Sequence, residues 1–304
     1  MYWALLALVA GGMAAAAIAF IVEYLRVIGR VREERDLELA TGLASLGTVW
    51  EAGRDAKRPS ADRLVMLHYP RSDEAEAYRS LVARIGFSGG ASRTLMVAST
   101  SPTDARSLVA ANTALAFADA GRNVILVDAD YRSPHIHSVF GVRNDRGLTT
   151  ILTDSNVPLG WATVPSPHPR LGLMTSGPVP QESAEPLGPR QLNALLRRLL
   201  QAADVVIFDS PPIESSLDAA VLAKEMHAML VVPRDTKEEE VEVAAQTLLT
   251  AESEFLGAVL YRQVRRSHRG AKAKITPAPE GWGPTWPMMY EQPARIPAAV
   301  GSAA

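Results

Sequence analysis

The 304-residue sequence contains no cysteine, which excludes disulfides, thiolate metal ligands and a cysteine nucleophile. An excess of charge of one sign is missing as well, because 31 basic residues are balanced by 33 acidic residues. Without a general attraction for nucleic acid, any charged partner must be bound by a local patch. Hydrophobic residues are not scarce. At 47% of the chain, they can form the core of one domain of roughly 200 residues with accessory segments.

Charge is absent from the first segment of the chain. Residues 2–22 form an apolar run that, at 1.5 Å per residue, can span the roughly 30 Å hydrocarbon core of a bilayer. A cleaved signal peptide and a buried helix are the alternatives, but no basic residue precedes the run. Basic residues follow it instead, at Arg26, Arg30, Arg32 and Arg35. By the positive-inside rule we predict a single-pass anchor in the inner (plasma) membrane, with the N-terminus outside and the main domain cytoplasmic.

Four regions follow from changes in composition along the chain. We expect a transmembrane anchor and juxtamembrane helix over residues 1–35, and a juxtamembrane segment and linker over residues 36–63. Residues 64–264 form the main domain. Residues 265–304 are rich in proline, alanine and glycine, and we expect this tail to be disordered because it cannot bury enough apolar surface to fold.

Within the main domain, short apolar runs alternate with segments of helical periodicity. Continuous apolar strands between helices are typical of a parallel sheet that is covered on both faces. We therefore predict a doubly wound, mostly parallel α/β fold. The strands are expected at 94–99, 123–130, 204–212, 228–233 and 255–261, and the helices near 73–87, 107–120, 189–202, 218–225 and 237–253.

Aspartates stand at the ends of two predicted strands. Asp128 and Asp130 end one apolar run, Asp209 ends another, and a third run leads into the loop 101–107 before a helix. Ligands of such sheets bind outside the carboxyl ends of the strands. Carboxylates there, facing a helix N-terminus, suit Mg²⁺ and phosphate. The alternative is that one aspartate caps a helix and the others are solvated.

Several motifs together resemble those of bacterial tyrosine autokinases (BY-kinases) and polysaccharide co-polymerases of capsule and exopolysaccharide synthesis. They are YPRSDEAEAYRSL in the first helix of the kinase domain, ILVDADYRSPHIHSVFG at its second aspartate motif, SGPVPQESAEPLG in the loop that follows, and VVIFDSPP at its Walker B strand. The resemblance extends from the anchor to about residue 264. It implies a fold of P-loop NTPase type, ATP and Mg²⁺ as cofactors, and membrane proteins of polysaccharide synthesis or export as partners. A chain-length regulator, an intact kinase paralogue and a second copy of the chain are further partners that it suggests.

The resemblance also implies roles for individual residues. The phosphate loop of the family, P-G-E-G-K-S, corresponds to residues 102–107, P-T-D-A-R-S. The implied catalytic residues are Asp130, Asp128 and Arg106. The implied cofactor-binding residues are Thr103, Asp104, Ala105, Arg106, Ser107 and Arg132, and the implied metal ligands are Ser107, Asp128 and Asp209.

The phosphate loop departs from the pattern of the family, because it has neither glycine nor lysine. Glycine allows the backbone to take positive φ and to wrap its N–H groups around phosphates, and Thr103 and Ala105 each add a Cβ there. The guanidinium of Arg106 is broad and planar, so it does not replace a compact ammonium at a tight site.

Two other family motifs are also reduced. Family kinases carry a tyrosine-rich tail as their phosphorylation substrate, whereas Tyr290 is the sole tyrosine after residue 264. The family pattern Glu-x-x-Arg-x-x-Arg, used for ring-like self-association, is here Glu76, Arg79 and Val82.

Three hypotheses for the function follow. The first is a membrane-anchored, kinase-like subunit, a pseudokinase, that regulates exopolysaccharide or capsule synthesis, chain length or export. The second is an active ATP-dependent tyrosine autokinase in which Arg106 replaces the lysine, and Asp128, Asp130 and Asp209 hold Mg²⁺ and activate the tyrosine hydroxyl. The third, which the residues resemble less, is a partitioning or septum-positioning ATPase.

Overall fold

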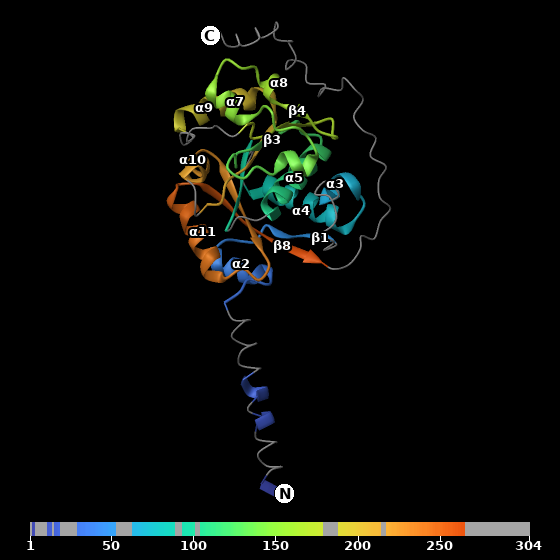
Figure 1. Ribbon diagram of the computed structural model, residues 1–304, viewed down its shortest axis with the longest axis vertical. Helices are drawn as coiled ribbons and strands as arrows, with labels where there is room; N and C mark the ends of the chain where they lie inside the picture. Colours follow the sequence, from blue (N-terminus) through green and yellow to red (C-terminus); the bar gives the residue numbers. More distant parts are fainter. Residues whose placement is uncertain are drawn as a thin grey trace, which may run out of the picture.

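One eight-stranded sheet organises the molecule (Figure 1). The computed structural model describes residues 2–3, 11–13, 15–18, 29–52, 63–88, 93–100, 104–178, 188–213 and 217–264. The strands lie in the order β1-β8-β7-β2-β6-β3-β5-β4, and all neighbours are parallel except β4 and β5. The predicted mostly parallel α/β fold is confirmed. The strands are β1 (Gly47–Ala52), β2 (Thr94–Ser99), β3 (Val124–Asp128), β4 (Val164–Pro165), β5 (Leu171–Met174), β6 (Val205–Asp209), β7 (His227–Pro233) and β8 (Glu254–Val264).

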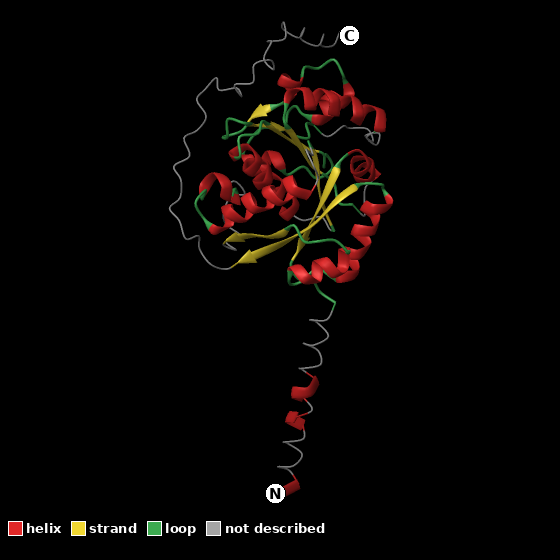
Figure 2. Ribbon diagram, turned by 180° about the vertical axis from the view of Figure 1, so that it is seen from behind, coloured by secondary structure: helices red, strands yellow, loops and turns green. Residues whose placement is uncertain are grey.

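Helices cover both faces of the sheet (Figure 2). The five long helical segments expected from the sequence correspond to α4, α5, α9, α10 and α11. Short helices between the strands had no counterpart in the prediction. The helices are α2 (Glu34–Thr41), α3 (Val65–His68), α4 (Asp73–Ser88), α5 (Asp104–Asp119), α6 (Ile136–Phe140), α7 (Leu148–Thr153), α8 (Leu159–Ala162), α9 (Pro189–Ala202), α10 (Leu217–Glu225) and α11 (Glu238–Thr250).

The continuous apolar runs of the central strands are explained by two separate core clusters, one on each side of the sheet. In β2, Leu95 and Val97 join the cluster beneath α4 and α5, whereas Met96 and Ala98 join the cluster beneath α9, α10 and α11. Successive side chains of a strand point to opposite faces, so a strand that is covered on both sides must be apolar at every position. Burying each Leu, Val or Met side chain contributes about 1.5–3 kcal/mol, and the strands that carry the site are fixed by this packing.

The segment expected as a juxtamembrane region and linker contributes to the folded sheet. Residues 36–63 had been placed before a domain that starts at Leu64, but α2 packs beside α11, and β1 pairs in parallel with β8. Leu46 and Val49 are buried in the core. The sequence prediction missed β1 because the run G-T-V-W-E-A is short and carries one buried face only.

Residues 29–32 are also fixed to the folded unit, at the loop between β7 and α11. The N–H of Val31 donates to the carbonyl of Thr236 (2.8 Å), and the N–H of Asp235 donates back to the carbonyl of Val31 (2.8 Å). The carbonyl of Gly29 accepts from the N–H of Glu238 (2.9 Å), one of the N–H groups that the first turn of α11 leaves without a helical partner. We call this set of contacts the residue 29–31 attachment. It lies at the carboxyl edge of the sheet, because β7 ends at Pro233.

The part of the chain that the structure describes contains no helix that is both long enough and apolar enough to cross a membrane. The predicted anchor over residues 2–22 lies largely outside the described residues, and it stays a prediction. The tail 265–304, with Tyr290, and Thr103 in the phosphate loop also lie outside them.

Candidate nucleotide site

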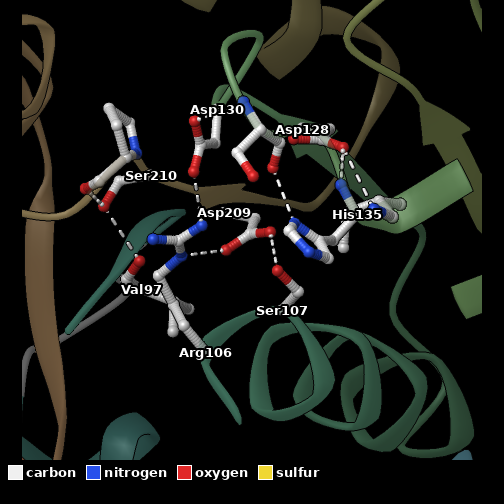
Figure 3. A network of polar contacts seen from close by, with 11 residues as sticks. Val97, Arg106, Ser107, Asp128, Asp130, His135, Asp209 and Ser210 are labelled. Carbon is white, nitrogen blue, oxygen red and sulfur yellow. Dashed lines mark hydrogen bonds and ion pairs between the residues drawn. The ribbon is translucent and has the colours of Figure 1, made fainter. Parts of the chain in front are cut away.

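The strand-end aspartates and the first turn of α5 meet at the carboxyl edge of the sheet (Figure 3). Asp128 and Asp209 end the neighbouring strands β3 and β6, where they are direct partners in the strand register. Strand β2 lies on the other side of β6, so the helix that follows it, α5, begins beside Asp209. Arg106 and Ser107 lie in the first turn of α5. They thereby face Asp209 and Asp130, which are distant from them in the sequence.

Arg106 bridges two carboxylates. Its Nε lies 2.7 Å from Oδ1 of Asp209, and its Nη2 lies 2.8 Å from Oδ2 of Asp130. The side chain of Arg106 is only 2% exposed. Burial opposes its charge, but the charges and hydrogen bonds of Asp209 and Asp130 outweigh burial and raise the pKa of the guanidinium. Arg106 is therefore charged and fixed in a buried ion-pair network.

The second carboxylate oxygen of Asp209, Oδ2, also accepts a hydrogen bond. The hydroxyl of Ser107 donates a hydrogen bond to Oδ2 of Asp209 (2.6 Å). Asp130, at its other oxygen, accepts from the N–H of Ser133 (3.1 Å). Arg106, Ser107, Asp209 and Asp130 therefore form one connected network of ion pairs and hydrogen bonds.

Asp128 is brought to the same edge, but it is turned away from Arg106. Its Oδ2 accepts hydrogen bonds from the N–H groups of His135 (3.1 Å) and Ile136 (3.0 Å), at the start of α6. Its Oδ1 is buried and has no hydrogen-bond partner among the described residues. Burial, and then the charges of Asp209 and Asp130, raise the pKa of this carboxyl well above its ordinary value. The neutral, protonated form of Asp128 is accordingly favoured.

The other predicted cofactor-binding residues do not join this network. Ala105 is buried in α5, and Arg132 is exposed. Asp104 begins α5, but its side chain lies outside the described residues, as does Thr103.

Sequence reasoning missed a second contact near the site. The hydroxyl of Tyr131, the residue between Asp130 and Arg132, donates to Oδ2 of Asp218 (2.5 Å), which connects the loop after β3 to α10. Nothing in the spacing of these two residues predicts the pair, because they are far apart in the sequence and meet through the sheet.

The arrangement of these residues does not fit Mg²⁺. The guanidinium and the Ser107 hydroxyl already engage both oxygens of Asp209, so a magnesium ion, which needs several oxygen ligands, would have to bind this carboxylate beside a fixed cation. At an effective dielectric constant of about 20, two like unit charges about 4 Å apart repel by about 4 kcal/mol, and a divalent ion beside Arg106 doubles this repulsion. Within the described ranges, no group of three or more His, Asp or Glu side chains is arranged to hold a metal.

Fold and site together define a kinase-like α/β domain in which Arg106 forms ion pairs with Asp209 and Asp130 at the carboxyl edge of the sheet. No protein-family model matches the sequence. The tyrosine-protein kinase YwqD of Bacillus subtilis is 32% identical over 201 residues, which cover 65% of this chain and 84% of that protein. This match shows that the chain belongs to the bacterial tyrosine-kinase family of capsule and exopolysaccharide biosynthesis.

Two solved structures support the fold assignment. The chimerical protein CapA2B2 superposes with a TM-score of 0.67 at 27% identity, covering 77% of this chain and 100% of that chain. The kinase domain of the Escherichia coli tyrosine kinase ETK superposes with a TM-score of 0.65 at 24% identity, covering 78% of this chain and 96% of that chain. The predicted resemblance to BY-kinases is confirmed.

Proposed function

We propose that this protein is a membrane-anchored, kinase-like subunit that regulates the synthesis, chain length or export of a capsular or extracellular polysaccharide, and that it acts by contact rather than by phosphoryl transfer. The observation that carries the proposal is the buried bridge of Arg106 between Asp209 and Asp130. Membership of the family supports this class of pathway. The bridge engages Arg106, Asp130 and Asp209, to which the resemblance assigns catalysis and the binding of cofactor and metal.

The chemistry of phosphoryl transfer supports this choice. Such enzymes work mainly by positioning the phosphates and neutralising their charge, and these are the tasks of the phosphate loop and the metal. Here the loop lacks glycine and lysine, and its serine is hydrogen-bonded to Asp209. Asp128, an implied catalytic residue and metal ligand, is turned to the backbone N–H groups of His135 and Ile136 and not to the other residues of the site.

The membrane location and the partners are part of the proposal. The apolar run 2–22 supports an anchor in the inner membrane with the domain in the cytoplasm. A membrane co-polymerase, a chain-length regulator or an intact kinase paralogue would be the partner that receives the regulatory contact.

Self-association through the family's helix motif receives less support. Arg79 on α4 pairs with Asp119 (3.2 Å) and with Glu76 (3.3 Å), and it donates to the carbonyl of Pro70 (2.7 Å). Val82, in place of the second arginine, packs against the core. Both positions are engaged within the chain rather than presented to a second copy.

An active kinase is the second candidate, and one observation favours it. Nη1 of Arg106 is buried without a hydrogen-bond partner among the described residues, so it could contact a phosphate oxygen. The membership in the tyrosine-kinase family favours either of these candidates over a positioning ATPase.

Phosphotyrosine formation and ATP binding decide between the two. The full-length chain in detergent micelles is incubated with Mg²⁺-ATP, and binding is measured by calorimetry. We expect neither saturable heat at millimolar nucleotide nor phosphotyrosine. The variant Thr103→Gly/Ala105→Gly/Arg106→Lys, which restores the family loop, is the matched control, and we expect it to gain nucleotide binding. Phosphotyrosine on the wild-type chain, lost in Asp209→Asn, would disprove the pseudokinase proposal.

A further inference from the structure

The side chains of the site form a nearly dry cluster of charges. Asp209 is fully buried, and the side chains of Asp130 and Arg106 are 6% and 2% exposed. Buried carboxylates are costly unless a cation and hydrogen bonds compensate them. In a working site of this kind a divalent metal supplies much of the compensating charge, and in this chain the compensation must come from its own residues.

We propose that the guanidinium of Arg106 is a built-in cation that takes the place of the divalent metal, and that it covers a latent divalent-cation site made by Asp209, Asp130 and Ser107. The inference rests on the proposed function and extends it to the charge balance of the same site. It makes the folded state independent of Mg²⁺ and of nucleotide.

The geometry of the guanidinium supports this assignment. Its planar fork reaches Asp209 with Nε and Asp130 with Nη2 at the same time, at 2.7 and 2.8 Å. The ammonium of a lysine is a single point charge and is not matched to two carboxylates in this planar way. Arg106 stands where the family's loop has lysine. It can therefore contact both Asp209 and Asp130, whereas a lysine ammonium is matched to one carboxylate.

The hydroxyl of Ser107 supports it as well. A hydroxyl has one proton and two lone pairs, so this oxygen keeps its lone pairs for an ion if the guanidinium is removed. In the described structure it uses its proton to bond Oδ2 of Asp209, and it thereby satisfies the second oxygen of the carboxylate that Arg106 holds by the first. Both oxygens of the central carboxylate are thus satisfied without a metal.

Removal of the Arg106 guanidinium should produce a gain of divalent-cation binding, which a mere loss of kinase activity would not predict. If the guanidinium covers the cation position, its removal leaves two carboxylates and a hydroxyl that face one another at the end of α5. Oxygen donors of this kind bind Mg²⁺ and Mn²⁺. The variant Arg106→Ser should therefore gain divalent-cation binding that the wild-type chain lacks.

The test measures Mn²⁺ alone, by the loss of the electron paramagnetic resonance signal of the free ion, on the full-length chain in detergent micelles. We expect wild type to bind no Mn²⁺ at this site at millimolar concentration. The dissociation constant of Arg106→Ser should lie at least about tenfold below the lower limit set for wild type, a difference of about 1.4 kcal/mol. The added substitution Asp209→Asn should abolish the gain. Arg122→Ser, which removes an exposed arginine outside the site, is the control and should bind no more than wild type.

Folding of each variant is checked by circular dichroism. If Arg106→Ser is unfolded without metal and folds when Mn²⁺ is added, the proposal is supported. Arg106→Lys is the second test, since its ammonium is matched to one carboxylate and leaves the other for the ion, and it should bind Mn²⁺ more tightly than wild type. Failure of both variants to bind or to be rescued would overturn the proposal.

Mn²⁺ binding to the wild-type chain that depends on Asp209 would also overturn it. This result without phosphotyrosine would leave the proposed regulatory function intact. Phosphotyrosine formation, by contrast, would disprove the proposed function itself, so the two failures are distinguishable.

Discussion

At the scale of single residues, Asp128 shows how burial beside other carboxylates changes a side chain. It has two backbone N–H donors for one oxygen and no described partner for the other, and its pKa is raised by burial and by the charges of Asp209 and Asp130. The folded state therefore binds the proton of Asp128 more tightly than the unfolded chain does. Raising the pH above the ordinary aspartate value removes this proton from the unfolded chain first, so the stability of the fold decreases as pH rises toward the folded-state pKa.

Replacing this carboxyl by its neutral isostere tests the argument. We expect Asp128→Asn to keep the bonds from His135 and Ile136 and to be at least as stable as wild type at pH 8, with a weaker decrease in stability between pH 5 and pH 8. Each unit by which the folded-state pKa of Asp128 exceeds its unfolded-state pKa corresponds to about 1.4 kcal/mol of pH-dependent stability, which the substitution removes. Urea unfolding at several pH values measures the effect, with the exposed Asp145→Asn as control. A variant that is less stable than wild type across the whole range would contradict the raised pKa.

Removal of the central cation should cost far more than removal of a surface cation. Arg106→Met leaves Asp209 and Asp130 buried without a partner, and we expect a loss of about 3–5 kcal/mol in the free energy of unfolding. The double variant Arg106→Met/Asp130→Asn should recover part of this loss. Denaturant titration measures both, and Arg122→Met on the exposed surface should change stability by less than about 0.5 kcal/mol. Equal losses in the buried and the exposed variant would show that the bridge contributes nothing.

The sequence predicted that Arg106, Ser107 and the three aspartates lie at one edge of the sheet, but not how they pair. The run of apolar residues places Asp128 and Asp209 at strand ends, and this follows from strand geometry alone. That Arg106 reaches Asp209 and Asp130, while Asp128 turns to the backbone of α6, depends on the packing of α5 and α6 against the sheet. No local pattern contains this information, because the partners are separated by up to 103 residues.

At the scale of the elements, a backbone contact fixes the turn before α7 to the end of β5. The N–H of Leu148 donates to the carbonyl of Thr175, and the N–H of Thr149 donates to the carbonyl of Ser176, each at 2.8 Å. Gly147 lies against the same carbonyl of Thr175, and a Cβ there would overlap it. The close approach of two backbone segments, rather than an unusual φ, therefore explains this glycine.

Two glycine substitutions with opposite expected signs check this account. Gly147→Ala should destabilise the fold by more than about 3 kcal/mol or prevent folding, because the obstacle is backbone that cannot rotate away. Gly86→Ala, on the exposed face of α4 with open space around it, should stabilise by about 0.4–1 kcal/mol. Thermal unfolding followed by circular dichroism measures both. A tolerated alanine at position 147 would contradict the packing described for this turn.

Element prediction succeeded for long periodic segments and failed for short ones. The strands β2, β3, β6, β7 and β8 and the helices α4, α5, α9, α10 and α11 lie where the apolar pattern placed them. Strand β5 has four residues, β4 has two, and α6, α7 and α8 have four to six, which is too few for a period to be visible. These short elements are held by tertiary contacts such as those of Gly147, not by local propensity.

At the scale of the whole molecule, the segment before residue 53 completes the sheet. Strand β1 covers the edge of β8, and Glu51 at its end pairs with Arg63 and accepts a hydrogen bond from the hydroxyl of Tyr261. Burial and the charge of Glu51 raise the pKa of that hydroxyl, so it remains a donor at physiological pH. The folded unit therefore depends on residues that the sequence had assigned to a linker.

Truncation at two positions tests this dependence. A chain that begins at residue 53 loses the buried side chains of Val31, Leu37, Leu46 and Val49. Their burial contributes about 6–12 kcal/mol, which is comparable with the total stability of a domain. We expect this chain to be unfolded or aggregated and a chain that begins at residue 29 to unfold cooperatively, as seen by circular dichroism and gel filtration. Equal melting temperatures for the two chains would contradict the role of β1 and α2.

The residue 29–31 attachment also determines how a pulling force would enter the molecule. Tension applied at residue 29 meets first the bonds to the loop between β7 and α11, with the ion pair between Arg32 and Asp235 (2.9 Å) beside them. The force is thus transmitted to β7, an interior strand, before it reaches α2 or the edge strand β1. A force applied at residue 29 therefore enters the sheet at β7, two strands away from β6, the strand that ends at Asp209.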